Sequence, residues 1–89
     1  MRRITLTSQF ENDVKRAKKR NYDMNKLSTI IQLLGQGDLE DRRYLDHTLK
    51  GKYDGLRECH LTPDWLLIYQ SFTEHVILVR TGTHADLFR

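Results

Sequence analysis

Histidines are the residues of this 89-residue chain best suited to chemistry at neutral pH. An unperturbed imidazole titrates at about pH 6.5, so it can act as a base or as an acid. His47 lies in a long segment without periodicity, His60 lies near the end of a predicted strand, and His84 follows the last predicted strand. If the predicted strands adjoin, these three histidines converge at one edge of the sheet, with Asp64 beside them. His75 falls at the opposite hairpin and is expected to stay apart.

Metal binding is an alternative use of the same histidines. A catalytic zinc site takes three protein ligands and leaves one position open, and His47, His60 and His84 could supply them. However, the sequence contains neither H-x-x-x-H nor C-x-x-C, and the gaps between the histidines are irregular. The pattern therefore favours acid–base chemistry, and we expect neither a metal nor another cofactor.

Arg80 is a charged residue on a strand face that strict alternation otherwise fills with Val76 and Leu78. Its planar guanidinium could hold a phosphate group in a two-pronged hydrogen bond. Alternatively, it extends to solvent or pairs with an acidic side chain such as Glu58. The sequence leaves both interpretations open.

Cations and two aromatic residues suggest an anionic partner. Fifteen Lys and Arg residues outnumber twelve Asp and Glu residues, for a net charge of +3. Lys50 and Lys52 make the non-periodic segment basic, and basic surfaces attract nucleic acid, although most charged faces are only solvated. Trp65 and Phe88 are candidates for base stacking. The alternatives are that Trp65 belongs to the core and that Phe88 packs the end of the chain down.

The composition also limits the compartment. Cys59 is the one cysteine, so no intramolecular disulfide forms, and a strand cysteine is most often a small buried hydrophobe. No apolar run approaches the roughly 18 residues that a membrane span requires. The first ten residues lack the features of a secretory signal. We therefore expect a cytoplasmic protein with no membrane partner.

The first half of the chain predicts one strand and two helices. Arg3–Leu6 alternates as a short strand does, and Ser8 and Glu11 form the S-x-x-E pattern of a capping box that begins a helix. Asp23 is a suitable N-cap for a second helix. The apolar faces of the two helices consist of Phe10, Val14 and Ala17, and of Met24, Leu27, Ile30, Ile31 and Leu34. Asn21 is expected to end the first helix, and Gly35 and Gly37 the second.

The second half begins with residues 38–53, which show no clear period and are expected to form a long, functional loop. Three strands are then predicted, over Leu56–Leu61, Trp65–Tyr69 and Val76–Thr81. The middle strand is apolar on both faces, as a covered central strand would be. The order β-α-α-β-β-β predicts a single α+β domain over residues 1–89, with a mainly antiparallel sheet and two helices packed on one face.

Three segments carry a resemblance to a known family. DMNKL, YLDHTLKGKYDGLRECHLTPDWLLIY and RTGTHADLF closely resemble the YafQ branch of the RelE-type bacterial toxins. The resemblance covers nearly the whole chain and is weakest in the first strand and over residues 35–43. It implies a small RelE-like β-α-α-β-β-β domain. It also implies an mRNA endonuclease that works on translating ribosomes and is silenced by a cognate antitoxin.

The resemblance assigns roles by position. The matching positions are His47, His60, Asp64 and His84 for the acid–base group, Trp65 and Phe88 beside the active site, and Arg80 facing a phosphate. RNA carries its own nucleophile, the 2′-hydroxyl, so cleavage needs a base, an acid for the leaving oxygen and cations for the charged intermediate. We expect His84 to be the proton donor, His60 or His47 to be the base, and Asp64 to orient a histidine.

Two other classes of function compete with this one. The first is a non-catalytic basic module that binds RNA or the ribosome. The second is an interaction protein whose basic surface exists for an acidic partner. In the toxin interpretation, the antitoxin is expected to use the basic helical surface, and operator DNA is contacted only indirectly, through the antitoxin complex.

Overall fold

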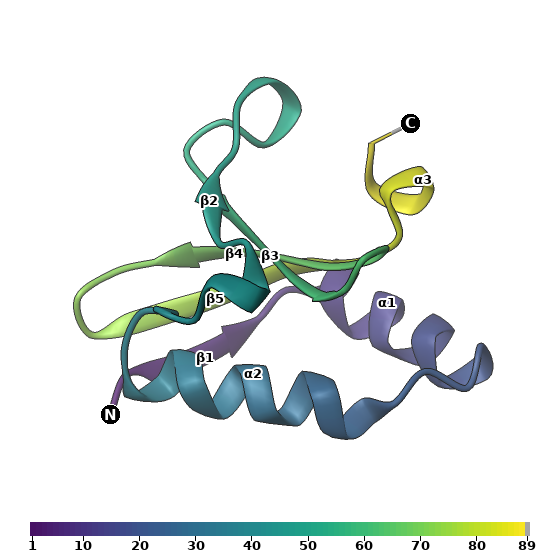
Figure 1. The fold of residues 1–89 in the computed structure, drawn as a ribbon, viewed down its shortest axis with the longest axis horizontal. Helices are drawn as coiled ribbons and strands as arrows, with labels where there is room; N and C mark the ends of the chain where they lie inside the picture. The colour runs from purple at the N-terminus through teal and green to yellow at the C-terminus, as the bar shows by residue number, and fades with distance from the viewer. Residues whose placement is uncertain (89) are drawn as a thin grey trace.

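The computed structural model describes residues 1–88 and contains a five-stranded sheet in the order β1-β5-β4-β3-β2 (Figure 1). In chain order the elements are β1 (Arg3–Leu6), α1 (Ser8–Lys19), α2 (Met24–Gln36), the 3₁₀ helix η1 (Arg42–Tyr44), β2 (His47–Thr48), the 3₁₀ helix η2 (Gly51–Tyr53), β3 (Arg57–Thr62), β4 (Trp65–Ser71), β5 (His75–Gly82) and α3 (His84–Leu87). The predicted α+β class and the order of its main elements are confirmed.

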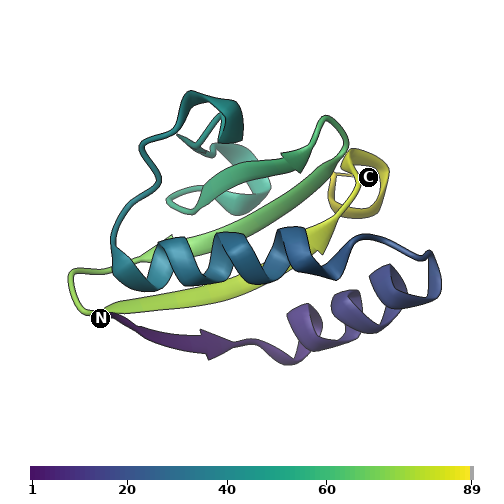
Figure 2. The same ribbon diagram turned by 60° about the horizontal axis from the view of Figure 1, so that its bottom comes forward.

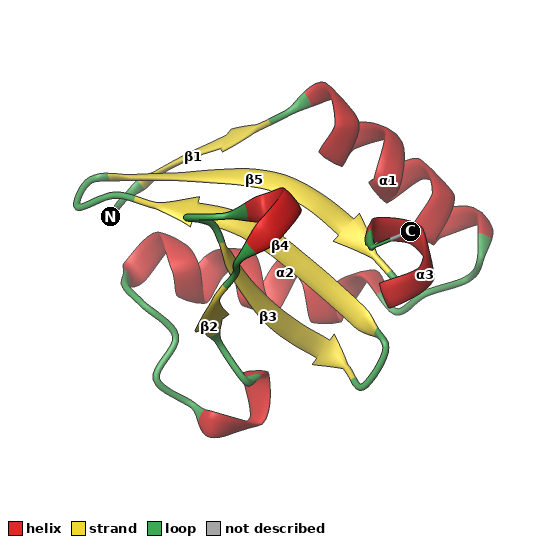
Figure 3. Ribbon diagram, turned by 90° about the horizontal axis from the view of Figure 1, so that it is seen from above, coloured by secondary structure: helices red, strands yellow, loops and turns green. Residues whose placement is uncertain are grey.

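The strand β4 lies at the centre of the sheet, between β5 and β3 (Figure 3). Its first five residues, Trp65–Tyr69, are all buried, as the sequence predicted for a strand covered on both faces. The pairs β2–β3, β3–β4 and β4–β5 are antiparallel, whereas β1 runs parallel to β5. The sheet is therefore mixed, with one parallel strand at its edge.

The helices α1 and α2 cover one face of the sheet (Figures 1 and 2). The core on that face consists of Phe10, Ala17, Leu27, Ile30, Leu34, Cys59, Trp65, Leu67, Tyr69, Val76 and Leu78. Burial of Cys59 raises the pKa of its thiol, so this residue acts as a small hydrophobe. Across residues 1–88, no helix is long and apolar enough to cross a bilayer.

The opposite face of the sheet carries a smaller core under α3 and the segment that joins β2 to β3 (Figure 1). Its buried residues are Leu49, Tyr53, Leu66, Ile68 and Leu87. Leu87 is fully buried, and the Tyr53 hydroxyl donates a 3.0 Å hydrogen bond to its carbonyl oxygen. These contacts hold the end of the chain against the sheet and fix the position of the residues before Leu87.

The helix α1 begins one residue earlier than the capping-box pattern predicted. Thr7, not Ser8, is the N-cap, and its hydroxyl accepts a 3.0 Å hydrogen bond from the backbone N–H of Phe10. Thr7 is already fixed to β5, because its N–H bonds to Leu78 O and its hydroxyl to Val79 O. The predicted N-cap of α2, Asp23, is confirmed.

Two details of the later segments differ from prediction. Gly37 ends α2, but Gly35 lies inside the helix. The segment 38–53 is not a plain loop, since it holds η1, β2 and η2, and β2 pairs with β3 through His47 opposite Glu58. A two-residue strand has no periodicity to detect, so only its partner defines it.

Candidate active site

The structure brings three of the four histidines together on the sheet face opposite α1 and α2. The ring centroids of His47 and His60 lie 6.4 Å apart, and those of His60 and His84 lie 5.9 Å apart. They come from β2, β3 and the start of α3. His75 lies at the other end of the sheet, where its ring stacks on Phe72 with centroids 6.1 Å apart. The predicted convergence and the predicted exclusion of His75 both hold.

Asp64 fixes the orientation of His84. Asp64 Oδ1 accepts a 3.0 Å hydrogen bond from the backbone N–H of His84 and lies 2.7 Å from its imidazole Nδ1. The hydrogen bond from the backbone N–H of His84 is the main cause that lowers the pKa of Asp64, and the bond with the imidazole lowers it further. The side chain of Asp64 is therefore a carboxylate. A capping box between Thr83 and Asp86 sets the start of α3. His84 Nε2 is thus the nitrogen that a substrate can reach, on a side chain that is 55% exposed.

Phe88 lies beside His84. Its position suits both alternatives that the sequence left open, packing of the chain end and an exposed aromatic face. Its ring packs edge-on against Tyr53, with centroids 5.5 Å apart, and lies 6.2 Å from the ring of His84. Phe88 nevertheless remains exposed. It therefore holds the end of the chain and still offers an aromatic face next to the histidines.

His47 is held by contacts on three sides. Its Nδ1 lies 2.6 Å from the carbonyl oxygen of Leu45, and its Nε2 lies 3.0 Å from Glu58 Oε2. The preceding Asp46 is anchored to the sheet, because Arg57 bonds to its carboxylate at 2.6 and 2.7 Å and the Tyr69 hydroxyl donates to it. These bonds fix the segment that carries His47.

We expect Asp46→Ala to lower the free energy of unfolding by about 1–3 kcal/mol, because it leaves the buried Tyr69 hydroxyl without an acceptor. Denaturant unfolding measures the loss, and the width of the His47 imidazole signal in NMR reports its release. Asp41→Ala is the matched control, since it removes a carboxylate of the same segment that, within residues 1–88, pairs only with exposed Arg43 and should change the stability little. Equal losses from the two variants would contradict the anchoring role.

Glu58 was not expected at the site except as a possible partner of Arg80. It is buried on β3, and its Oε1 lies 4.0 Å from His60 Nε2. Within residues 1–88, Glu58 Oε1 and His60 Nδ1 are buried atoms without a hydrogen-bond partner. Glu58 and His60 are two residues apart on one strand and so share a face. An acidic residue on a half-buried face beside a histidine is the signal that could have found it.

Arg80 does not share the face of Val76 and Leu78, so that prediction was wrong. Ile68 pairs with Arg80 while Tyr69 pairs with Leu78, which leaves one extra residue on β5 and shifts the alternation. Beyond the end of β1, Arg80 reaches α1 and forms two bonds to Asp13, at 2.7 and 3.0 Å. The Asp13 carboxylate raises the pKa of Arg80, so its guanidinium stays charged. Its acidic partner is thus Asp13 and not Glu58.

Trp65 leaves no face on which a base could stack. It is 3% exposed, its indole N–H donates to the Thr81 hydroxyl at 2.9 Å, and its ring packs on Tyr22. Trp65 is therefore a core residue, as the alternative interpretation predicted, and it packs on the sheet face opposite the histidines. Lys50 and Lys52, in contrast, are exposed on the segment between β2 and β3.

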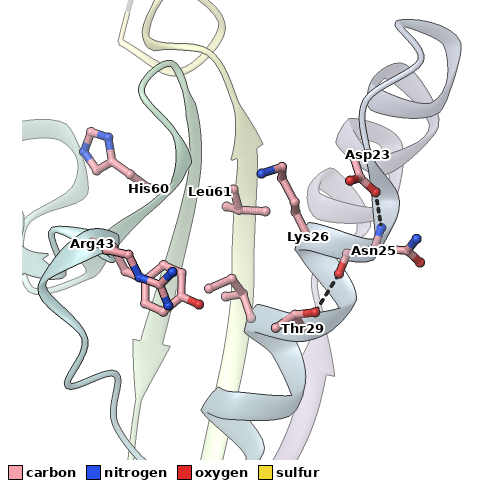
Figure 4. A pocket seen from close by; sticks show the side chains of 9 residues that line it. Asp23, Asn25, Lys26, Thr29, Arg43, His60 and Leu61 are labelled. Carbon is pink, nitrogen blue, oxygen red and sulfur yellow. Dashed lines mark hydrogen bonds between the residues drawn. The ribbon is translucent and has the colours of Figure 1, made fainter.

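A cavity of about 410 Å³ has one of the three histidines, His60, in its lining (Figure 4). It lies between η1 and the N-terminal half of α2, and His60, Lys26, Arg43 and Tyr44 contribute to its lining. The two cations and the aromatic ring suit a phosphate and a base, respectively. Among the described residues, no group of three or more His, Cys, Asp or Glu side chains is arranged to hold a metal ion.

Comparisons with known proteins agree with this small α+β fold and show the class of protein to which it belongs. Residues 2–89 match the family model described as a bacterial toxin of type II toxin–antitoxin systems, YafQ. The chain belongs to this YafQ toxin family.

Individual relatives are similar over their whole length. The mRNA interferase toxin YafQ of Escherichia coli K12 is 44% identical over 98% of this chain and 96% of its own. The crystal structure of YafQ from E. coli BL21(DE3) matches with a TM-score of 0.93 and 42% identity over the full length of both chains. YafQ in the E. coli DinJ–YafQ toxin–antitoxin complex matches with a TM-score of 0.89 and 43% identity, over 99% of this chain and 98% of that one.

Proposed function

We propose that this toxin is an endoribonuclease that cleaves mRNA on the ribosome, in the cytoplasm, by histidine acid–base catalysis without a metal ion. The name of its relatives, mRNA interferase, supports the reaction class. The observation that carries the mechanism is the cluster of His47, His60 and His84 on one sheet face, with Asp64 bonded to His84. This cluster places several imidazoles, the side chains best suited to proton transfer, next to one another.

Cleavage proceeds by attack of the ribose 2′-oxygen on the adjacent phosphorus. A base, His60 or His47, takes the 2′-hydroxyl proton while the O2′–P bond forms. The P–O5′ bond breaks, and His84 gives its proton to the leaving 5′-oxygen. The products are a 2′,3′-cyclic phosphate and a 5′-hydroxyl, and each proton transfer contributes about 10²–10⁴-fold to the rate.

The pairing of His84 with Asp64 suits the role of acid. With Nδ1 donating to the Asp64 carboxylate 2.7 Å away, Nε2 of the imidazolium is the nitrogen that gives its proton to the leaving oxygen. Nε2 belongs to the exposed end of the ring, where the leaving oxygen can approach it. Asp64 therefore holds both the orientation and the charge state that the donor requires.

Cations and aromatic residues around the cluster bind the message. Arg80 faces the scissile phosphate with its charge, and the exposed Lys50 and Lys52 contact neighbouring phosphates. Phe88 offers a stacking face beside His84, and the cavity with Lys26, Arg43 and Tyr44 holds a flanking nucleotide. Because these contacts are few, the ribosome supplies the remaining positioning of the RNA.

A cognate antitoxin silences the protein. The E. coli relative forms a complex with the antitoxin DinJ. In this chain, the helix α1 carries exposed Lys15, Lys18 and Lys19, which suit an acidic antitoxin segment. Operator DNA is reached only through that complex.

The test is cleavage of a defined mRNA by the purified protein, with and without translating ribosomes. We expect codon-aligned cuts with 5′-hydroxyl ends, on ribosome-bound mRNA only. A chelator that removes zinc and copper but spares the magnesium of the ribosome should leave the rate unchanged. Absence of cuts while the protein still binds ribosomes would instead favour a non-catalytic module, and loss of cleavage with the chelator would contradict metal independence.

A further inference from the structure

Both imidazole nitrogens of His47 face hydrogen-bond acceptors. Nδ1 lies 2.6 Å from the Leu45 carbonyl oxygen, which can only accept, and Nε2 lies 3.0 Å from Glu58 Oε2. A neutral imidazole carries one N–H, whereas the imidazolium carries two. One proton must therefore lie between His47 Nε2 and Glu58 Oε2, in addition to the proton on Nδ1.

The position of that proton follows from the ordinary acidity of the two groups. A glutamic acid normally loses its proton near pH 4.3 and an imidazolium near pH 6.5, so the proton rests on the imidazole. The His47 side chain is 51% exposed, so water solvates the positive charge on the ring. The Glu58 side chain is only 6% exposed and has His47 as its one close cationic partner within residues 1–88.

Glu58 also faces the second histidine of the cluster. Its other oxygen, Oε1, has no hydrogen-bond partner among residues 1–88 and lies 4.0 Å from His60 Nε2. A buried carboxylate oxygen without a partner costs free energy unless a donor or a positive charge reaches it. The oxygen is therefore placed to stabilise a proton on His60.

We infer that Glu58 is a positioning residue that fixes His47 as an imidazolium, so that His47 stabilises the charged phosphorane and His60 takes the 2′-hydroxyl proton. This inference deepens the proposed function and rests on it. A ring that donates through both nitrogens has no lone pair with which to act as a base, which removes His47 from the two candidates. His60 remains, and Glu58 Oε1 faces the charge that His60 gains.

The proton balance of the step is then complete. His60 gains the proton of the 2′-hydroxyl as the O2′–P bond forms, and His84 loses one to the 5′-oxygen as the P–O5′ bond breaks. His47 keeps both of its protons throughout. The ring of His47 lies 6.4 Å from the ring of His60, the base. Its positive charge is therefore close to the reacting phosphate and stabilises the phosphorane oxygens.

Nitrogen-15 NMR of the imidazole side chains in the purified protein tests the first half of the inference. At neutral pH we expect both nitrogens of His47 to give the signals of protonated nitrogen. In Glu58→Gln, which keeps the shape but removes the charge, one of them should change to an unprotonated nitrogen. Glu74→Gln, on the exposed hairpin between β4 and β5, is the control and should change nothing. A neutral His47 in the unaltered protein overturns the inference, even if Glu58→Gln fails to fold.

Cleavage kinetics test the second half. Glu58→Gln should lower kcat by about 10²-fold with little change in KM, because RNA binding does not involve the buried carboxylate. Glu58→Asp, which keeps the charge, should recover part of that loss. Full activity in a folded Glu58→Gln with a neutral His47 would overturn the role of the imidazolium. If the unaltered protein does not cleave RNA at all, the proposed function fails, while the NMR result still decides the charge state of His47.

Discussion

His84→Ala is expected to reduce the rate of mRNA cleavage by about 10²–10⁴-fold and to abolish toxicity, with no loss of the fold. The change removes the proton donor for the 5′-oxygen, which must otherwise leave as an unprotonated alkoxide. The fold survives because His84 is mostly exposed and Leu87, not His84, fills the core under α3. Single-turnover cleavage of ribosome-bound mRNA measures the loss, and growth after induction measures toxicity.

Two further variants separate this effect from the loss of any histidine. His75→Ala should leave cleavage unchanged, because His75 lies at the far hairpin beside Phe72. Asp64→Asn should reduce the rate less than His84→Ala, because the donor remains but loses its carboxylate partner. A folded His84→Ala that still arrests growth and cuts mRNA would remove His84 from the chemistry.

The sequence predicted the long elements because their burial repeats over many residues. Leu27, Ile30 and Leu34 mark one face of α2 through three turns, and the continuous apolar run of β4 identifies a central strand without any tertiary information. Features set by a partner were missed. The two residues of β2 are a strand only because β3 pairs with them, and the extra residue in β5 is visible only against β4.

The histidines of the site and the carboxylate of Asp64 could be predicted, but the contacts of Glu58 and Asp13 could not. The expectation that the predicted strands adjoin already placed His60 and His84 at one edge of the sheet, whereas His47 joins them through the unpredicted strand β2. Asp13 lies 67 residues from Arg80 in sequence. In the sequence it cannot be distinguished from the other charged residues on the polar faces of the first helix. Glu58 shares a strand face with His60, but its burial depends on the elements that pack over that face.

Asp13→Ala is expected to lower the free energy of unfolding by about 3–5 kcal/mol, the cost of removing one partner from a buried ion pair. Asp13 is 3% exposed and accepts bonds from Arg80, from Arg16 and from the backbone N–H of Thr81. Its loss leaves the Arg80 guanidinium, itself mostly buried, without its counter-charge. Small domains have only about 5–15 kcal/mol of stability in total, so a large share would be lost.

The control for this change lies on the same helix. Glu11→Ala removes an exposed carboxylate from the first turn of α1 and should cost no more than about 1 kcal/mol. Denaturant unfolding of Asp13→Ala, Arg80→Ala and the double variant then isolates the pair, with an expected coupling of about 0.5–3 kcal/mol. Additive losses would show that Asp13 stabilises α1 without acting through Arg80. Coupled losses, together with weaker binding of RNA by Asp13→Asn, would mean that α1 holds the arginine in position for the phosphate.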